Sequence, residues 1–187
     1  VPVLIQLIDH PLPEVREFAV YALGQVKAEA AGEDLIDLVE DENGRVRNAA
    51  IQTLGKLRTK KAGPILVQAL ANPSYDGFRG SLYHALANIQ AEEAIPLLIE
   101  GVERPPWFHQ NAALNSLFQI DPDTCFPLVY EALRNKEYQI RRNAVILLLR
   151  SPRKESLDPL REVTEDEDFE TRFYAKQAIR LIESEDK

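Results

Sequence analysis

The chain has 187 residues, 45% of them hydrophobic, which is enough apolar content for a packed core. The 30 acidic side chains outnumber the 22 basic ones, and the net charge of −8 disfavours nucleic acid as a partner, because an acidic protein repels phosphate backbones. A single cysteine excludes an internal disulfide and fits a reducing compartment, so we expect a cytoplasmic protein.

No apolar run approaches the roughly 18–20 residues that a membrane span needs, and no signal peptide is visible. We therefore expect no membrane contact. The sequence contains no methionine, not even an initiator, and this leads us to expect a processed or excised piece of a longer chain.

Arginine returns along the chain at a nearly constant interval. It stands at Arg16, Arg47, Arg79, Arg141 and Arg172. The spacings are 31, 32, 62 and 31 residues, so the long gap is two periods, and Gln110 stands where the missing arginine would be. We call these six positions the anchor positions. A fixed period of this length indicates stacked helical hairpins rather than a compact domain around one enclosed site. The period predicts one continuous solenoid with units 1–30, 31–61, 62–93, 94–124, 125–155 and 156–187.

Each unit is predicted to hold two helices. The first begins near a proline, because the missing N–H of proline would be unbonded in a first turn anyway. These prolines are Pro2, Pro64, Pro96, Pro127 and Pro159. The second unit lacks one, and we expect Gly32-Glu33-Asp34 to start its first helix. A polar turn then leads to the second helix, which carries the anchor and apolar residues at helical spacing.

The anchor arginines have two interpretations, a basic ladder for an acidic partner or a structural role. We favour the structural role, because a polar residue precedes most anchors by six or seven positions and can receive the arginine at the inter-helix turn. These residues are Asp9, Asp41, Asn72, Asn135 and Asp166. Exposed pairs of this kind contribute only about 0.2–1 kcal/mol each, so they would fix register more than stability.

The segment Asp41–Gly55, DENGRVRNAAIQTLG, resembles the short HEAT-like repeat first described in phycobilisome lyases. The likeness covers all six units. It implies an all-α fold, a right-handed α-α superhelix with the second helices lining its concave side and the arginine tying neighbouring units together. It says little about function, because such repeats occur in scaffolds, adaptors and a few enzymes.

Positions one, five and nine residues after each anchor turn away from the buried stripe, toward the concave surface that the resemblance implies. In the second to fourth units they include Gln52, His84, Asn88, Asn111, Asn115 and Gln119. Carboxamides both donate and accept hydrogen bonds, so such a strip can bind the backbone of an extended peptide. The alternative is that any solvated helix face is polar.

The same positions change character in the last two units. In the fifth they include Arg142 and Arg150, with Arg134, Lys136, Arg153 and Lys154 nearby. This basic cluster is either a receptor for an acidic or phosphorylated partner segment or a solvated face. In the sixth unit Phe173 and Leu181 are apolar, which indicates either a partner or further repeats that cover them.

Three aromatic residues are possible partner anchors. Trp107 and Phe108 follow two prolines at the start of the fourth second helix, and exposed aromatic side chains there would be good anchors. We favour packing instead, beside residues such as Tyr75 or Phe78. Tyr21 is the better surface candidate because it lies five residues after its anchor.

Enzymatic readings find little support in the sequence. The three histidines, His10, His84 and His109, lie in separate units without metal-ligand spacing. The His-Glu pairs of HEAT-like iron hydroxylases are absent. Cys125 lies near a predicted helix start, which could lower its pKa, but no histidine is placed to activate it, so we favour packing. We predict no catalytic residue, no cofactor and no metal site.

The sequence therefore predicts a scaffold or adaptor. Its concave groove, with Arg142 and Arg150 at one end, would hold a segment of a partner protein. The resemblance alone supports the alternative of a bilin lyase subunit, and a spacer within a larger protein is a third reading.

Overall fold

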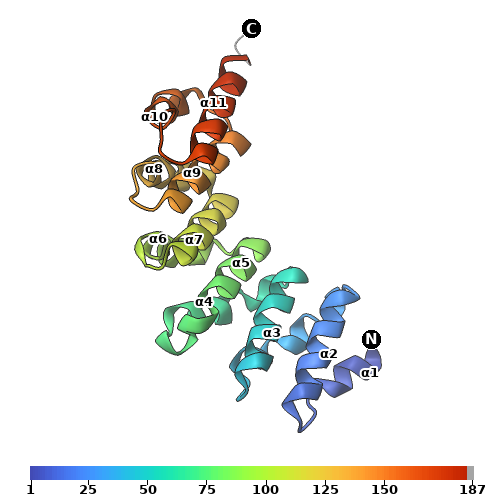
Figure 1. Ribbon diagram of the computed structural model, residues 1–187. Helices are drawn as coiled ribbons and strands as arrows, with labels where there is room; N and C mark the ends of the chain where they lie inside the picture. Colours follow the sequence, from blue (N-terminus) through green and yellow to red (C-terminus); the bar gives the residue numbers. More distant parts are fainter. Residues whose placement is uncertain (185–187) are drawn as a thin grey trace. The chain divides into compact units, whose positions relative to one another are not determined.

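The computed structural model describes residues 1–184, and in that range it consists of α-helices and short 3-10 turns, with no strand (Figure 1). The predicted all-α class is confirmed. The chain folds as two compact units, Val1–Ile99 and a second that begins at Glu100. The division into six repeats of one solenoid stays a prediction.

The first unit is built from first and second helices that alternate between two layers, except that a 3-10 segment takes the place of the first helix in the second repeat. They are α1 (Pro2–Leu7), α2 (Pro13–Gln25), α3 (Gly44–Lys56), α4 (Gly63–Ala71) and α5 (Arg79–Ile89). The second helices of successive repeats pack on one another, α2 on α3 and α3 on α5 (Figure 1). Their buried stripes follow the predicted spacing, with Leu23 in α2 and Leu54 in α3 fully buried at seven residues after the anchor.

The helices α3 and α5 approach each other most closely at Gly55. A Cβ atom built on Gly55 would lie 2.6 Å from the Cα atom of Ala85, a distance that real Cβ atoms do not show. Glycine is therefore required here by the contact between the two backbones.

The first helix of the second repeat differs from the prediction. Instead of an α-helix starting at Gly32, the chain forms three 3-10 turns, Glu29–Ala31, Glu33–Leu35 and Asp37–Glu40. None of the three has a side-chain cap to begin an α-helix. Ala31, Leu35 and Val39 are nevertheless buried at four-residue spacing, so the segment still provides an apolar stripe.

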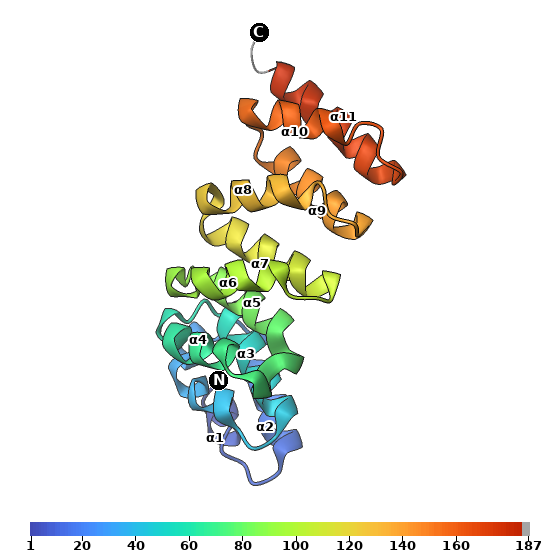
Figure 2. The same ribbon diagram turned by 90° about the vertical axis from the view of Figure 1, so that its left-hand side faces the viewer.

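The second unit repeats the same alternation. After α6 (Ile95–Glu103), which spans the boundary, come α7 (Trp107–Ile120), α8 (Pro122–Ala132), α9 (Tyr138–Arg150), α10 (Leu157–Glu162) and α11 (Phe169–Ser184). Within this unit α8 packs on α9 and α10 on α11, as Figure 2 shows from the side. The second helices again contact one another, α7 with α9 and α9 with α11.

The prediction that Pro127 starts a helix is wrong. α8 begins at Pro122, five residues earlier, and Pro127 lies in its interior. The physical reason is a better start upstream, because Asp121 accepts a hydrogen bond from the Thr124 N–H at 3.2 Å and Pro122 fills the first turn.

Among residues 1–184, no helix combines the length and the apolar character that crossing a bilayer requires.

Candidate functional site

The arginine at the first anchor position joins two repeats. Arg16 Nη1 donates to the carbonyl oxygens of His10, at 2.9 Å, and Pro11, at 3.2 Å, in the turn of its own repeat. Its Nε and Nη2 donate to both carboxylate oxygens of Asp41, at 2.8 and 2.9 Å, in the turn of the next repeat. The ion pair is almost fully buried, since the side chain of Arg16 is 9% exposed and that of Asp41 is 6% exposed.

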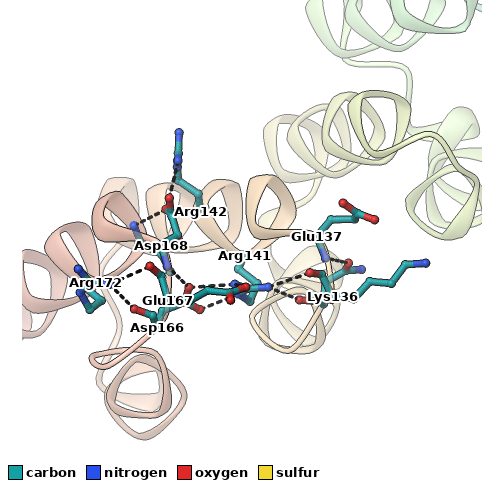
Figure 3. A network of polar contacts seen from close by, with 10 residues as sticks. Lys136, Glu137, Arg141, Arg142, Asp166, Glu167, Asp168 and Arg172 are labelled. Atoms are coloured by element: carbon teal, nitrogen blue, oxygen red, sulfur yellow. Dashed lines mark hydrogen bonds and ion pairs between the residues drawn. The ribbon is translucent and has the colours of Figure 1, made fainter.

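Arg141 makes the same set of contacts in the second unit (Figure 3). Nη1 donates to the carbonyl oxygens of Asn135 and Lys136, and Nε and Nη2 donate to Asp166 at 2.6 and 2.9 Å. In both cases the carboxylate lies 25 residues after the arginine. The structural interpretation is supported, but the acid belongs to the following repeat rather than to the arginine's own repeat.

The other anchor arginines make only part of this set. Arg47 and Arg172 donate through Nη1 to the carbonyl oxygens six and five residues before them. The position 25 residues after Arg47 holds Asn72, whose Oδ1 accepts instead from the Ser74 N–H. Arg47 lies over the rings of Tyr75 and Phe78, and its Nε is buried without an acceptor. Arg79 pairs with Asp76.

Both carboxylates of the complete pairs have lowered pKa values. Burial raises the pKa of Asp41, but the hydrogen bonds from Arg16 and from the Asn43 N–H outweigh it. Hydrogen bonds from Arg141 lower the pKa of Asp166, against a smaller opposing effect of burial. A carboxylate whose folded-state pKa lies below its unfolded value stabilises the fold above the unfolded pKa, and this contribution is lost as the pH falls through the folded pKa.

We therefore expect the free energy of unfolding to fall as the pH is lowered from about 5 toward 2, because unfolded aspartates titrate near 3.9. The variant Asp41→Asn/Asp166→Asn should be less stable at neutral pH and should show a shallower acid loss. Urea unfolding followed by circular dichroism at several pH values measures both. Equal pH slopes for the variant and the wild type would contradict the assignment.

In the first unit, two of the polar positions on α3, Asn48 and Gln52, are connected through Ser81 on α5. Ser81 Oγ donates to Asn48 Oδ1 at 2.8 Å and accepts from Gln52 Nε2 at 3.2 Å, so these side chains bridge neighbouring repeats. His84 and Asn88, one turn apart on α5, are exposed and have no hydrogen bond or ion pair within residues 1–184. The first unit therefore presents Gln52, His84 and Asn88 to solvent.

In the second unit, the predicted carboxamides of α7 are less exposed. Asn111 is half-buried, and its Nδ2 donates to the carbonyl oxygen of Gln139 in α9 at 3.1 Å. Asn115 is half-buried and Gln119 is exposed. We call the exposed and half-exposed side chains at these positions the polar strip. It comprises Gln52, His84 and Asn88 in the first unit, and Asn111, Asn115 and Gln119 in the second.

The basic cluster of the fifth repeat is mostly paired, which corrects the interpretation as a receptor for acidic segments. Arg142 donates to both oxygens of Asp168, at 3.1 and 2.7 Å (Figure 3). It also pairs with Glu170. Arg134 pairs with Glu162, and Arg153 with Asp123. Each of these carboxylates lies 26 to 30 residues away in sequence, so the pairing joins neighbouring repeats. Arg150 remains exposed and unpaired among the described residues.

Asp168 explains why Arg142 is held in place. This aspartate precedes α11 and also accepts hydrogen bonds from the N–H and the Oγ1 of Thr171, both at 2.8 Å. The bonds from Arg142 come first among the causes that lower the pKa of Asp168, ahead of those from Thr171 and against burial. A single carboxylate thus caps a helix and neutralises the arginine.

The aromatic candidates are on the surface. The preference for packing of Trp107 and Phe108 is wrong, because they are 39% and 52% exposed and contact each other edge to face. They directly follow a turn of two prolines, in the first turn of α7, where a side chain has few neighbours. Tyr21 is exposed, as expected. In the sixth repeat, Phe173 and Leu181 are exposed as well.

A cavity lies at the fourth anchor position, where Gln110 stands in place of arginine. It has a volume of about 140 Å³, and its wall includes Gln110, Leu114, Asn135 and Ile140. In the sequence, the signal for this cavity is the missing arginine, which by itself does not show that a cavity forms.

The single cysteine, Cys125, is buried. Burial raises the pKa of Cys125 to about 12, with a smaller contribution from the charge of Asp121, so the thiol is protonated and its Sγ donates to the Leu114 carbonyl oxygen. The idea that the helix start lowers this pKa is wrong, and packing is the role observed. Within residues 1–184 no three His, Cys, Asp or Glu side chains gather as metal ligands would.

Two family models match the chain. HEAT repeats match residues 1–87, and the PBS lyase HEAT-like repeat matches residues 85–104. The resemblance inferred from Asp41–Gly55 is therefore confirmed. No curated protein matches the chain.

Several solved structures are similar at low sequence identity. Computationally designed armadillo repeat proteins for modular peptide recognition are 16% identical, with 96% of this chain and 98% of theirs covered and a TM-score of 0.64. The archaeal HEAT-like repeats protein from Thermococcus onnurineus NA1 is 18% identical, with 97% and 86% covered and a TM-score of 0.60. At these identities the two show the fold alone. The complex of CpcE and CpcF of phycocyanin lyase from Nostoc sp. PCC7120 is 20% identical, with 97% and 94% covered and a TM-score of 0.48.

Proposed function

We propose that this chain, in which HEAT-type repeat models match residues 1–104, is a non-catalytic scaffold, and that the part of the polar strip on each unit binds an extended segment of another protein. The observation that carries the proposal is the pair His84 and Asn88. Both are exposed on one face of α5, one turn apart, and neither side chain makes a hydrogen bond or an ion pair within the described residues.

The chemistry of the strip suits a peptide backbone. A carboxamide or imidazole side chain can serve both the N–H and the carbonyl groups of an extended chain, which gives affinity with little dependence on sequence. Packed helices lie about 8–10 Å apart, and an extended peptide advances about 3.3 Å per residue, so each repeat would meet roughly every third residue. The designed armadillo proteins that share this fold were made for modular peptide recognition, which supports the same mode here.

The partner is not required to be acidic. Arg142, which was predicted to receive carboxylates, is already neutralised by Asp168 and Glu170. Arg150 is the exposed cation that remains at the polar positions of α9. We therefore propose that the polar strip is mainly neutral, and that Arg150, at the corresponding position of α9, contributes one cation beyond it.

Selection of binders from a random peptide library, followed by fluorescence anisotropy with the selected peptides, tests the proposal. We expect His84→Ala/Asn88→Ala to weaken binding by about 10-fold, since each lost hydrogen bond costs about 0.5–1.5 kcal/mol. Asn115→Ala/Arg150→Ala tests the second unit in the same way. The matched control is Gln68→Ala, which removes an exposed carboxamide from α4 in the other layer. Peptides that bind the strip variants and the control equally well would overturn the proposal.

A further inference from the structure

The fourth repeat lacks the guanidinium that Arg16 and Arg141 each hold between the turns of successive repeats. At four anchor positions, an arginine Nη1 donates to the carbonyl oxygens six and five residues before it. At the fourth, Gln110 Nε2 instead donates to the carbonyl oxygen of Val102, eight residues before it, at 2.9 Å. The carbonyl oxygens of Arg104 and Pro105, which correspond to those acceptors, receive no hydrogen bond from Gln110.

The cavity at Gln110 occupies the place of the missing group. Its lining includes Val102, Glu103 and Asn135, and Asn135 follows Gln110 by 25 residues. Asp41 and Asp166 receive Arg16 and Arg141 from the same relative position. The cavity volume of about 140 Å³ is close to that of a cavity of about 150 Å³ that holds benzene, so it has room for a flat guanidinium group.

The lining suits a long cationic side chain. Apolar groups of Leu114, Leu128 and Ile140 form part of the wall, along which a methylene chain can lie. Glu103 and Glu131 supply negative charge at the same cavity. The guanidinium head would thus find both carboxylates and a polar amide.

The cavity opens toward a wider depression of about 480 Å³, with which it shares Glu103, Gln110 and Asn135. Trp107 and Glu137 line this outer part. Trp107 is partly exposed, and the face of its indole ring can attract a cation through a cation–π interaction. The outer part therefore places one aromatic ring, the carboxylates of Glu103 and Glu137 and one cation, Lys136, at the mouth of the cavity.

We propose that this cavity binds an arginine side chain of a partner protein, which takes the place that the repeat's own arginine takes elsewhere. Arginine fits better than lysine, because Arg16 and Arg141 each use the planar fork to reach two carbonyl oxygens and an acidic side chain at once. The inference rests on the proposed function in that the partner is a protein. It concerns a different surface from the polar strip, so either proposal can fail alone.

The experiment uses the chain's single tryptophan, Trp107, as the reporter. Nα-acetyl-arginine amide is titrated into the protein while tryptophan fluorescence is recorded, with the uncharged analogue Nα-acetyl-citrulline amide as the matched ligand. We expect a saturable change with the arginine compound and affinity weaker by about 10-fold for citrulline, because only the first carries charge. No saturable response, or equal affinity for both, would overturn the proposal.

Variants at the anchor position make the test specific. Gln110→Arg supplies the guanidinium from within the chain, so it should raise the melting temperature and abolish the response to the arginine compound. Gln110→Met, of similar length and uncharged, should keep the response. Glu103→Gln/Glu131→Gln, both at the cavity wall, should weaken it by about 5-fold or more. A Gln110→Arg variant that is less stable, or that still binds as the wild type does, contradicts the assignment.

The outcome is separable from that of the peptide experiment. His84→Ala/Asn88→Ala leaves the cavity intact and should bind the arginine compound as the wild type does. Loss of peptide binding with an unchanged arginine response, or the reverse, would show which of the two surfaces has been assigned wrongly.

Discussion

Asp41→Ala is expected to lower the free energy of unfolding by about 3 kcal/mol, because it leaves the Arg16 guanidinium buried without its counter-ion. The aspartate also accepts the Asn43 N–H at 2.8 Å, so the turn before α3 loses a hydrogen bond in the same variant. Urea unfolding followed by circular dichroism measures the difference from the wild type.

Glu42→Ala is the matched control for this change. Glu42 also approaches Arg16, at 3.4 Å, but its side chain is 84% exposed, so its loss should change stability by less than about 0.5 kcal/mol. If the two variants are equally stable, the buried pair does not hold the first two repeats together in the way we describe.

Gly55→Ala is expected to destabilise the protein by about 2–3 kcal/mol, because the added methyl group would overlap the backbone of α5 at Ala85. The clash involves a Cα atom rather than the end of a flexible side chain, so the helices α3 and α5 must move apart to relieve it. The melting temperature and the urea midpoint should both fall.

Gly80→Ala provides the comparison within the partner helix. A Cβ on Gly80 meets no atom within 4 Å, and Gly80 lies inside α5, so alanine there should stabilise by about 0.5–1 kcal/mol through its higher helix propensity. Similar effects of the two substitutions would mean that helix propensity, and not the approach of the two helices, governs both sites.

The repeat period made the fold predictable to a large extent. Regular spacing of Leu23 and Leu54 after their anchors places them on the buried side of α2 and α3, and the structure buries both completely. The 3-10 turns between Glu29 and Glu40 were not predictable in this way, because the four-residue spacing of the apolar residues fits an α-helix and does not show that the segment breaks into short turns.

The candidate site was less predictable, because sequence proximity does not reveal partners in the next repeat. The sequence suggests one basic cluster that includes Arg134, Arg142 and Arg153. In the structure, each of these arginines pairs with a carboxylate 26 to 30 positions away in sequence. Asp41 and Asp166 were chosen correctly as acceptors but assigned to the wrong arginine. Once the interval of 25 residues is known, it can be applied to the sequence directly.

The interval of 25 residues between an anchor arginine and its carboxylate also determines what happens when one repeat is removed from the chain. Removing residues 31–61, one full period, would bring Asn72 to the place of Asp41 opposite Arg16. The shortened protein would keep its spacing yet exchange a charged acceptor for a neutral one. Repeats in this chain are therefore not interchangeable cassettes, because the junction that each one forms depends on a side chain carried by its successor.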